Sequence, residues 1–168
     1  DTWNHTEAAM ALSTAGLHTA AERAFDWLAQ SQRSDGSWHH YYLSDGVEDA
    51  KVDTNCCAYV ATGVLHHFRT TGDKSFLEGM WLTVKRALDF VVGHQTASGH
   101  IPWAIHTSGT PWSYSLVTGS SSILHSLRCG IAIASHLGYE HPEWEFAAVR
   151  LANLLRNHEG QFEPKRRW

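Results

Sequence analysis

Several features are scarce in this sequence, and each scarcity excludes a class of protein. The 168 residues include three cysteines and four prolines, and 13 Lys and Arg stand against 17 Asp and Glu. No stretch approaches the roughly 18 uninterrupted apolar residues of a membrane span, and no basic patch of the kind that binds nucleic acid is present. The odd cysteine count, within apolar helical patterns, argues against a disulfide framework. We therefore expect a soluble cytoplasmic protein with reduced thiols and no nucleic-acid partner.

What the chain does contain is a threefold repeat. The segment AFDWLAQSQRSDGSW (24–38) has a second copy in ALDFVVGHQTASGHIPW (87–103) and a weaker third in RLANLLRNHEGQFEPKRRW (150–168). Their glycines, Gly36, Gly99 and Gly160, lie 63 and 61 residues apart. The first two copies both end in a tryptophan, Trp38 and Trp103, for which packing between helices is the favoured role. A period of this length predicts an array of supersecondary units that share one core.

Apolar spacing divides each repeat into two helices. The spacing i, i+3, i+4, i+7 and i+8 from Cys56 to Val64 indicates a packed helix that begins near Asp53 and runs to Gly72. Its partner begins at the capping-box pattern Ser75-x-x-Glu78. The other pairs cover 5–15 with 17–32 and 121–137 with 142–158. Alternation of the strand type is absent, so we predict an all-α domain of three helical hairpins over residues 1–168.

The segment from Gln32 to Trp38 resembles the Gln-x-x-Asp-Gly-x-Trp repeat of the terpenoid cyclase and protein prenyltransferase α/α toroids. The stretches DTWNHTEAAMAL (1–12) and SSSILHSLRCGIA (120–132) resemble a bacterial group labelled prenyltransferase-like. The resemblance implies a ring of helical hairpins, an architecture related to six-hairpin glycosidases and sugar epimerases. Such rings close with about six hairpins. With about three hairpins and no initial Met, this chain is expected to be a fragment that self-associates or recruits a missing C-terminal half.

In such a ring, the loops from outer to inner helices all lie on one rim, where we expect the site. Glu7 and Asp53 are candidate catalytic carboxylates, although Glu in a first turn also complements the helix dipole and Asp before a helix is an ordinary N-cap. His125 is a third catalytic candidate, with packing in a helix interface as its alternative. The predicted substrate-binding residues are Trp3, Asn4, His5, Tyr41, Asn55, Trp112, Ser122 and Arg128.

No metal or other cofactor is expected, because the 13 histidines show no tight ligand spacing. The adjacent pair at 66–67 lies at the far end of its helix and is expected on the surface. A zinc ion held by Asp53, Cys57 and His125, as in the Asp, Cys and His set of protein prenyltransferases, is a minor alternative, as is magnesium. The spacing Asp53-Thr54-Asn55-Cys56 departs from the Asp-x-Cys pair of that family.

Three functions fit these residues. The first is a prenyltransferase-like or cyclase-like enzyme acting on an isoprenoid, with His125 and Arg128 meeting a diphosphate, and it ranks narrowly ahead. The second is a carbohydrate-active enzyme in which Glu7 and Asp53 act as acid and base on a sugar held against Trp and Tyr rings. The third is a binding module without chemistry.

Overall fold

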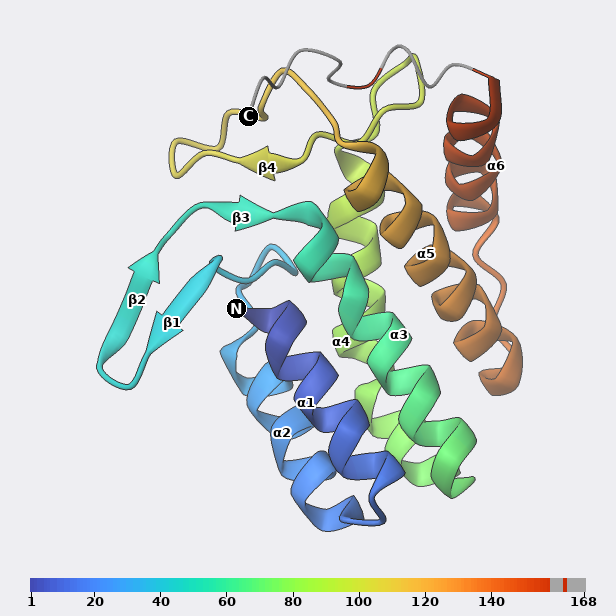
Figure 1. The fold of residues 1–168 in the computed structure, drawn as a ribbon. Coiled ribbons are helices and arrows are strands. Elements are labelled where there is room, and N and C mark those ends of the chain that lie inside the picture. The colour runs from blue at the N-terminus through green and yellow to red at the C-terminus, as the bar shows by residue number, and fades with distance from the viewer. Residues whose placement is uncertain (158–161, 163–168) are drawn as a thin grey trace.

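A computed structural model describes residues 1–157 and 162. Within this part of the chain, three antiparallel hairpins contain all the helices (Figure 1). In chain order, the hairpins are α1 (Thr2–Thr14) with α2 (His18–Ser31), α3 (Thr54–Thr71) with α4 (Lys74–Gly93), and α5 (Val117–Leu137) with α6 (Pro142–Asn157). The prediction of an all-α fold built from helical hairpins is confirmed.

The hairpins form two layers. Helix α3 lies between α1 and α5 and packs against both, so the first helices of the three hairpins form one row. Helix α4 packs against α2 and α6 in the second row. A continuous core fills the space between the rows, and it includes the fully buried rings of Phe25, Trp38 and Trp144. None of the helices in the described residues is both long enough and apolar enough to span a bilayer.

The helix boundaries follow from side-chain caps. The Asp53 carboxylate accepts the Cys56 N–H at 3.0 Å and caps α3, as predicted. The capping box expected at Ser75 is wrong, because Asp73 is the N-cap of α4 and accepts the Phe76 N–H at 3.0 Å. Helices α1 and α5 begin three and four residues earlier than the predicted starts at 5 and 121. The predicted end of the last helix at His158 lies outside the described residues, as does Gly160 of the third repeat.

The repeat motif joins neighbouring hairpins through its glutamine. The Gln32 Nε2 group donates to the Gly36 carbonyl at 3.0 Å and to the Thr83 carbonyl of α4 at 2.9 Å. In the second copy, Gln95 donates in the same way to Gly99 at 3.0 Å and to Ala147 of α6 at 3.1 Å. Each glutamine therefore closes its own turn and also fastens that turn to the next outer helix.

The tryptophans that end the first two copies are not equivalent. Trp38, which is 1% exposed, follows Gly36 by two residues and donates its Nε1–H to the Leu28 carbonyl at 2.9 Å. Two residues after Gly99 stands Ile101, which is equally buried, while the partly exposed Trp103 follows two residues later. The buried position of the repeat is therefore defined by its distance from the glycine, and Trp103 does not occupy it.

The far end of α3 also differs from expectation. His67 is fully buried rather than on the surface, because its ring packs between Phe25 and Phe76 and its Nδ1 lies 2.7 Å from the Ser13 hydroxyl. The core of the first two hairpins therefore extends to this end of the helices.

Two short β pairs interrupt the helical pattern. Strands β1 (Tyr41–Leu43) and β2 (Gly46–Asp49) form a hairpin, and β3 (Val52–Asp53) pairs antiparallel with β4 (Ala104–Ile105). Both pairs lie in the connections α2–α3 and α4–α5, beyond the ends of the helices (Figure 1). Strands of two to four residues are too short to show alternation, which explains why the sequence did not predict them.

Candidate active site

The two long connections are joined to each other at the start of α3. In the antiparallel pair of β3 and β4, Val52 lies opposite Ile105 and Asp53 lies opposite Ala104. The pairing continues into the helix, where the Thr54 N–H donates to the Trp103 carbonyl at 3.1 Å and the Thr54 hydroxyl donates to the Pro102 carbonyl at 2.7 Å. The first turn of α3 is therefore held in place by a loop that lies some 50 residues further along the sequence.

Asp53 is the most deeply buried carboxylate of this region, with 5% of the residue exposed. Burial raises the pKa of its carboxyl group, and the backbone N–H groups at the start of α3 oppose that rise only in part. One oxygen caps the helix, as described above. A buried carboxyl group with a raised pKa can carry a proton closer to neutral pH than an exposed one can.

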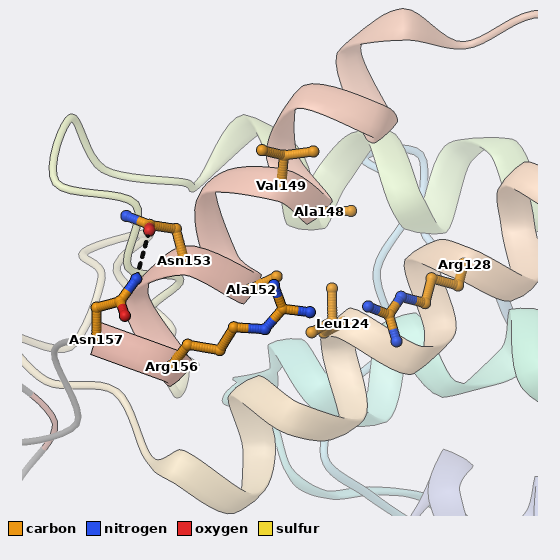
Figure 2. Close-up of a pocket in the computed structure, with 8 residues that line it drawn as sticks. All are labelled: Leu124, Arg128, Ala148, Val149, Ala152, Asn153, Arg156 and Asn157. Carbon is orange, nitrogen blue, oxygen red and sulfur yellow. Dashed lines mark hydrogen bonds between the residues drawn. The ribbon is translucent and has the colours of Figure 1, made fainter.

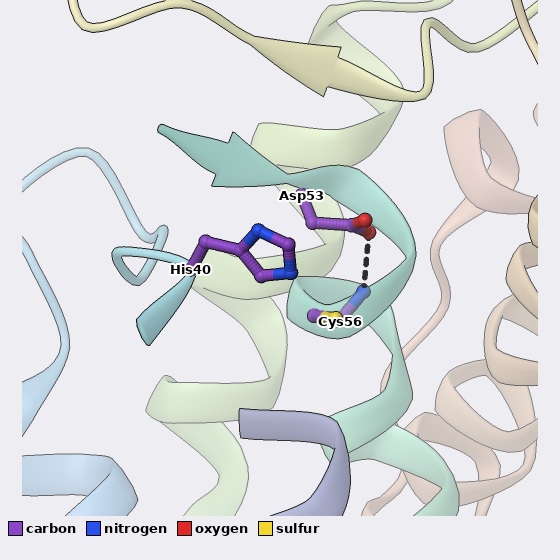
Figure 3. Close-up of side chains that lie close together, drawn as sticks. All are labelled: His40, Asp53 and Cys56. Atoms are coloured by element: carbon purple, nitrogen blue, oxygen red, sulfur yellow. Dashed lines mark hydrogen bonds between the residues drawn. The ribbon is translucent and has the colours of Figure 1, made fainter. Parts of the chain in front are cut away.

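Three potential metal ligands meet at this carboxylate (Figure 3). His40, Asp53 and Cys56 each place one ligand atom within 4.8 Å of the others. Burial raises the pKa of the Cys56 thiol, and the neighbouring Asp53 charge raises it further. Burial, together with Lys51, lowers the pKa of His40. A cation that bound here would have to displace the thiol proton and would compete with the capping bond.

The zinc set expected from the prenyltransferase resemblance has different surroundings. The Cys57 sulfur lies 4.0 Å from the Trp38 carbonyl oxygen, toward the core, and burial raises the pKa of this thiol to about 12. His125, on α5, places its Nε2 at 3.5 Å from the Cys129 sulfur. Of the three predicted ligands, only Asp53 belongs to the group in Figure 3.

Glu7, the second candidate carboxylate, is exposed on α1 and bonds to α3. Its Oε1 accepts a hydrogen bond from the Tyr59 hydroxyl, and Trp3 stacks on the Tyr59 ring with centroids 3.9 Å apart. Burial and the adjacent carboxylate raise the pKa of Tyr59, so the phenol keeps its proton. Sequence reasoning assigned Tyr59 to the packed stripe of its helix. Tyr59 stands one helical turn after Asn55, which was predicted to lie at the rim. This spacing is the signal in the sequence that could have placed Tyr59 near the rim.

The other predicted binding residues divide between the rim and elsewhere. Asn55 lies beside α5, where a Cβ built on Gly119 would meet the Asn55 Cβ at 3.8 Å. Tyr41 is 39% exposed and stacks on His40 at 4.3 Å. His5 turns toward the outer row, where its Nε2 lies 2.8 Å from the Ala24 carbonyl oxygen. Asn4 donates hydrogen bonds from its backbone N–H and from its side-chain amide to the carboxylate of Asp1, which is the N-cap of α1.

Arg128 lies in a separate pocket of about 350 Å³ between α5 and α6 (Figure 2). Arg156 and Asn153 line the same pocket from α6, and Leu124 lines it from α5. His125 is not among the lining residues of this pocket. This pocket therefore does not support the expected pairing of His125 with Arg128 around one anion.

Buried side-chain polar atoms without a hydrogen-bond partner are concentrated at the rim. Within residues 1–157, five of them lie in the loops or in the first two turns of the helices that follow: His40 Nδ1, Asn55 Oδ1, Trp112 Nε1, Ser120 Oγ and Ser122 Oγ. The other two, in His66 and His67, lie at the opposite end of α3. Buried groups of this kind cost stability and are typical of functional regions. They mark the rim as a region where the chain is not optimised for stability alone.

The sequence was compared with family models and with curated proteins. No family model matches it. It is 48% identical, over all 168 residues, to MMP endo-(1,4)-3-O-methyl-alpha-D-mannosidase from Mycolicibacterium hassiacum, and the chain spans 46% of that protein. It is also 28% identical, over 83 residues, to the uncharacterized glycosyl hydrolase MJ1610 from Methanocaldococcus jannaschii, covering 49% of this chain and 14% of that protein.

Both relatives carry glycosidase names. The first-ranked prediction, an isoprenoid transferase or cyclase, is therefore wrong. The error arose because the Gln-to-Gly turn motif indicates how helical hairpins are connected. That connection does not depend on which reaction the rim residues carry out. The carbohydrate alternative, which rested on the acids and aromatic rings of the loops, agrees with the relatives.

Proposed function

We propose that this chain supplies part of the active site of a glycoside hydrolase that cleaves internal α-(1,4) bonds in a chain of 3-O-methylated mannose. The observation that carries the proposal is the 48% identity over the whole chain to a protein named for that activity. The aligned region spans the rim loops as well as the helices. The carboxylates, tyrosines and tryptophans of the rim are the residue types that hold and hydrolyse sugars.

In the proposed reaction, Asp53 is the general acid. Its burial favours the protonated form, and the hydrogen bond from Cys56 fixes its orientation. The Asp53 proton passes to the glycosidic oxygen as the bond from that oxygen to the anomeric carbon breaks.

Glu7 is the second carboxylate. The Tyr59 hydroxyl holds one of its oxygens, which leaves the other to accept a proton from the attacking water. The water oxygen bonds to the anomeric carbon, so the products are two shorter chains, one with a new reducing end and the other with a hydroxyl at the former glycosidic oxygen.

The test uses conservative variants of the complete native polypeptide that contains this sequence. Asn caps a helix as well as Asp does, so Asp53→Asn keeps the fold of α3 while removing the transferable proton. Glu7→Gln keeps the Tyr59 hydrogen bond. Asp26→Asn, on the exposed face of α2, is the matched control. The assay measures new reducing ends released from α-(1,4)-linked 3-O-methylmannose oligosaccharides.

We expect kcat to fall by at least about a hundredfold in Asp53→Asn and in Glu7→Gln, and to stay unchanged in Asp26→Asn. Asp53→Asn should also abolish the alkaline limb of the pH profile. Hydrolysis by the wild-type protein with both variants fully active would refute the roles of Asp53 and Glu7. No hydrolysis by the wild-type protein would refute the proposed activity.

A further inference from the structure

The group formed by His40, Asp53 and Cys56 brings three kinds of ligand atom together at the start of α3 (Figure 3). One atom from each residue lies within 4.8 Å of the other two, and the aspartate and the cysteine are 5% and 8% exposed. Nitrogen, oxygen and sulfur are all ligands of Zn²⁺, whereas Ca²⁺ and Mg²⁺ bind oxygen ligands. The composition of the group therefore favours zinc.

The fold positions these three residues before any metal binds. Asp53 is the N-cap of α3, and Cys56 stands three residues later in the first turn. The β3–β4 pair fixes the backbone of Asp53, and the His40 N–H donates to the Lys51 carbonyl at 2.8 Å. Tyr41 stacks on the His40 ring with centroids 4.3 Å apart. A cation would therefore meet ligands whose backbone and ring positions are already set.

Asp49 lies on the other side of the His40 ring. Its Oδ2 is 3.6 Å from His40 Nδ1, a buried nitrogen that has no hydrogen-bond partner among the described residues. The opposite edge of the ring, with Nε2, is directed at Asp53 and Cys56 (Figure 3). A metal-binding histidine commonly donates its other N–H to a carboxylate, which orients the ring and makes the ligating nitrogen more basic. Lys51 holds the same Asp49 oxygen at 2.8 Å and fixes that carboxylate.

Zinc binding at this group requires the loss of one proton. Burial keeps the Cys56 thiol protonated by raising its pKa. On binding, the S–H bond breaks, the proton leaves to solvent, and the sulfur electron pair bonds to the metal. The competition between a metal and the helix cap is limited, because the Asp53 carboxylate has two oxygens.

We propose that His40, Asp53 and Cys56 bind one zinc ion, and that this ion inhibits hydrolysis. The metal site stands on the geometry of the group, while the inhibition rests also on the proposed function. Three protein ligands leave a fourth position of a tetrahedral zinc ion for water. Zinc on Asp53 takes the place of the proton that the general acid must transfer, and its positive charge keeps that proton away. Zinc is then an inhibitor and not a cofactor.

The experiment uses cobalt(II) as a visible substitute for zinc in the complete native polypeptide, with the cysteines kept reduced. A thiolate ligand gives cobalt a charge-transfer band in the near ultraviolet. Cys56→Ser removes the sulfur, His40→Gln removes the nitrogen, and Asp49→Asn removes the carboxylate beside the ring. Cys129→Ala is the matched control, because Cys129 is a second buried thiol that lies 3.5 Å from a histidine nitrogen, Nε2 of His125. Circular dichroism checks that each variant is folded.

We expect the charge-transfer band in the wild-type protein and in Cys129→Ala, and its loss in Cys56→Ser. Zinc affinity, measured by displacement of cobalt, should fall by about 10–100-fold in Asp49→Asn and by at least as much in His40→Gln. Absence of the band from the folded wild-type protein would overturn the metal site. A band that persists in folded Cys56→Ser, or unchanged zinc affinity in His40→Gln, would overturn it as well.

Hydrolysis is then measured with and without zinc, and each variant is compared with its own metal-free rate. Saturating zinc should slow the wild-type protein and Cys129→Ala by at least about a hundredfold, the loss expected when a general acid is blocked. It should not slow Cys56→Ser. Full wild-type activity with zinc bound would overturn the inhibition. Absence of hydrolysis without zinc would refute the proposed function and the inhibition with it, while the cobalt spectra still decide the metal site.

Discussion

Gly36 and Gly99 occupy equivalent turns but stand at different distances from the next helix, and this difference gives a quantitative test of the repeat geometry. Both have positive φ angles, 91° and 97°. A Cβ on Gly36 would lie 2.3 Å from the Arg86 carbonyl oxygen and 2.7 Å from its carbon. A Cβ on Gly99 would lie 3.5 Å from the equivalent Arg150 oxygen, which is ordinary contact.

An alanine at either position suffers the left-handed strain of about 1–2 kcal/mol. At Gly36 the new methyl group also overlaps a backbone carbonyl within α4 that cannot rotate away, and overpacking of this kind costs a further 1–3 kcal/mol or so. We therefore expect Gly36→Ala to lower the free energy of unfolding by about 2–5 kcal/mol and Gly99→Ala by about 1–2 kcal/mol. Gly72→Ala, with a φ of 72° and no atom within 4 Å, should resemble Gly99→Ala.

Urea unfolding followed by tryptophan fluorescence and by circular dichroism measures these differences, with the slope compared among the variants. Equal losses for Gly36→Ala and Gly99→Ala, within about 0.5 kcal/mol, would refute the close approach of the first turn to α4. A loss for Gly72→Ala as large as that for Gly36→Ala would assign the whole effect to backbone strain.

Two further predictions concern titratable groups. Because burial raises the folded pKa of Asp53 above its ordinary value of 3.8, stability is lost as pH rises from that value through the folded pKa. Asp53→Asn caps without ionising, so its thermal midpoint should exceed the wild-type value at pH 7 and match it near pH 3; a lower midpoint at pH 7 would contradict this sign. Cys56, Cys57 and Cys129 are buried with raised thiol pKa values, so a thiol reagent should label them only after unfolding. Rapid labelling of the native protein would contradict their burial.

The sequence alone determined the hairpin repeat, because that repeat is written in local signals. The i, i+3, i+4 spacing of α3 and the positive-φ glycines after α2 and α4 depend on neighbours within a turn or two. The N-cap at Asp53 is equally local, and it was predicted correctly. The turn glutamines were recognised as part of the motif, but their second partners, Thr83 and Ala147, belong to other hairpins and were not foreseen.

Only the tertiary structure decided which chemistry-bearing residues meet. The pairing of Asp53 with Ala104 depends on two loops separated by a whole hairpin, and no local spacing encodes it. The hydrogen bond from Tyr59 to Glu7 and the approach of His40 to Cys56 also join different elements, so local spacing does not encode them either. Helix packing also placed His67 in the core and Arg128 in the pocket between α5 and α6. Periodicity specifies which face of a helix is apolar, but the arrangement of the helices in the array specifies what that face touches.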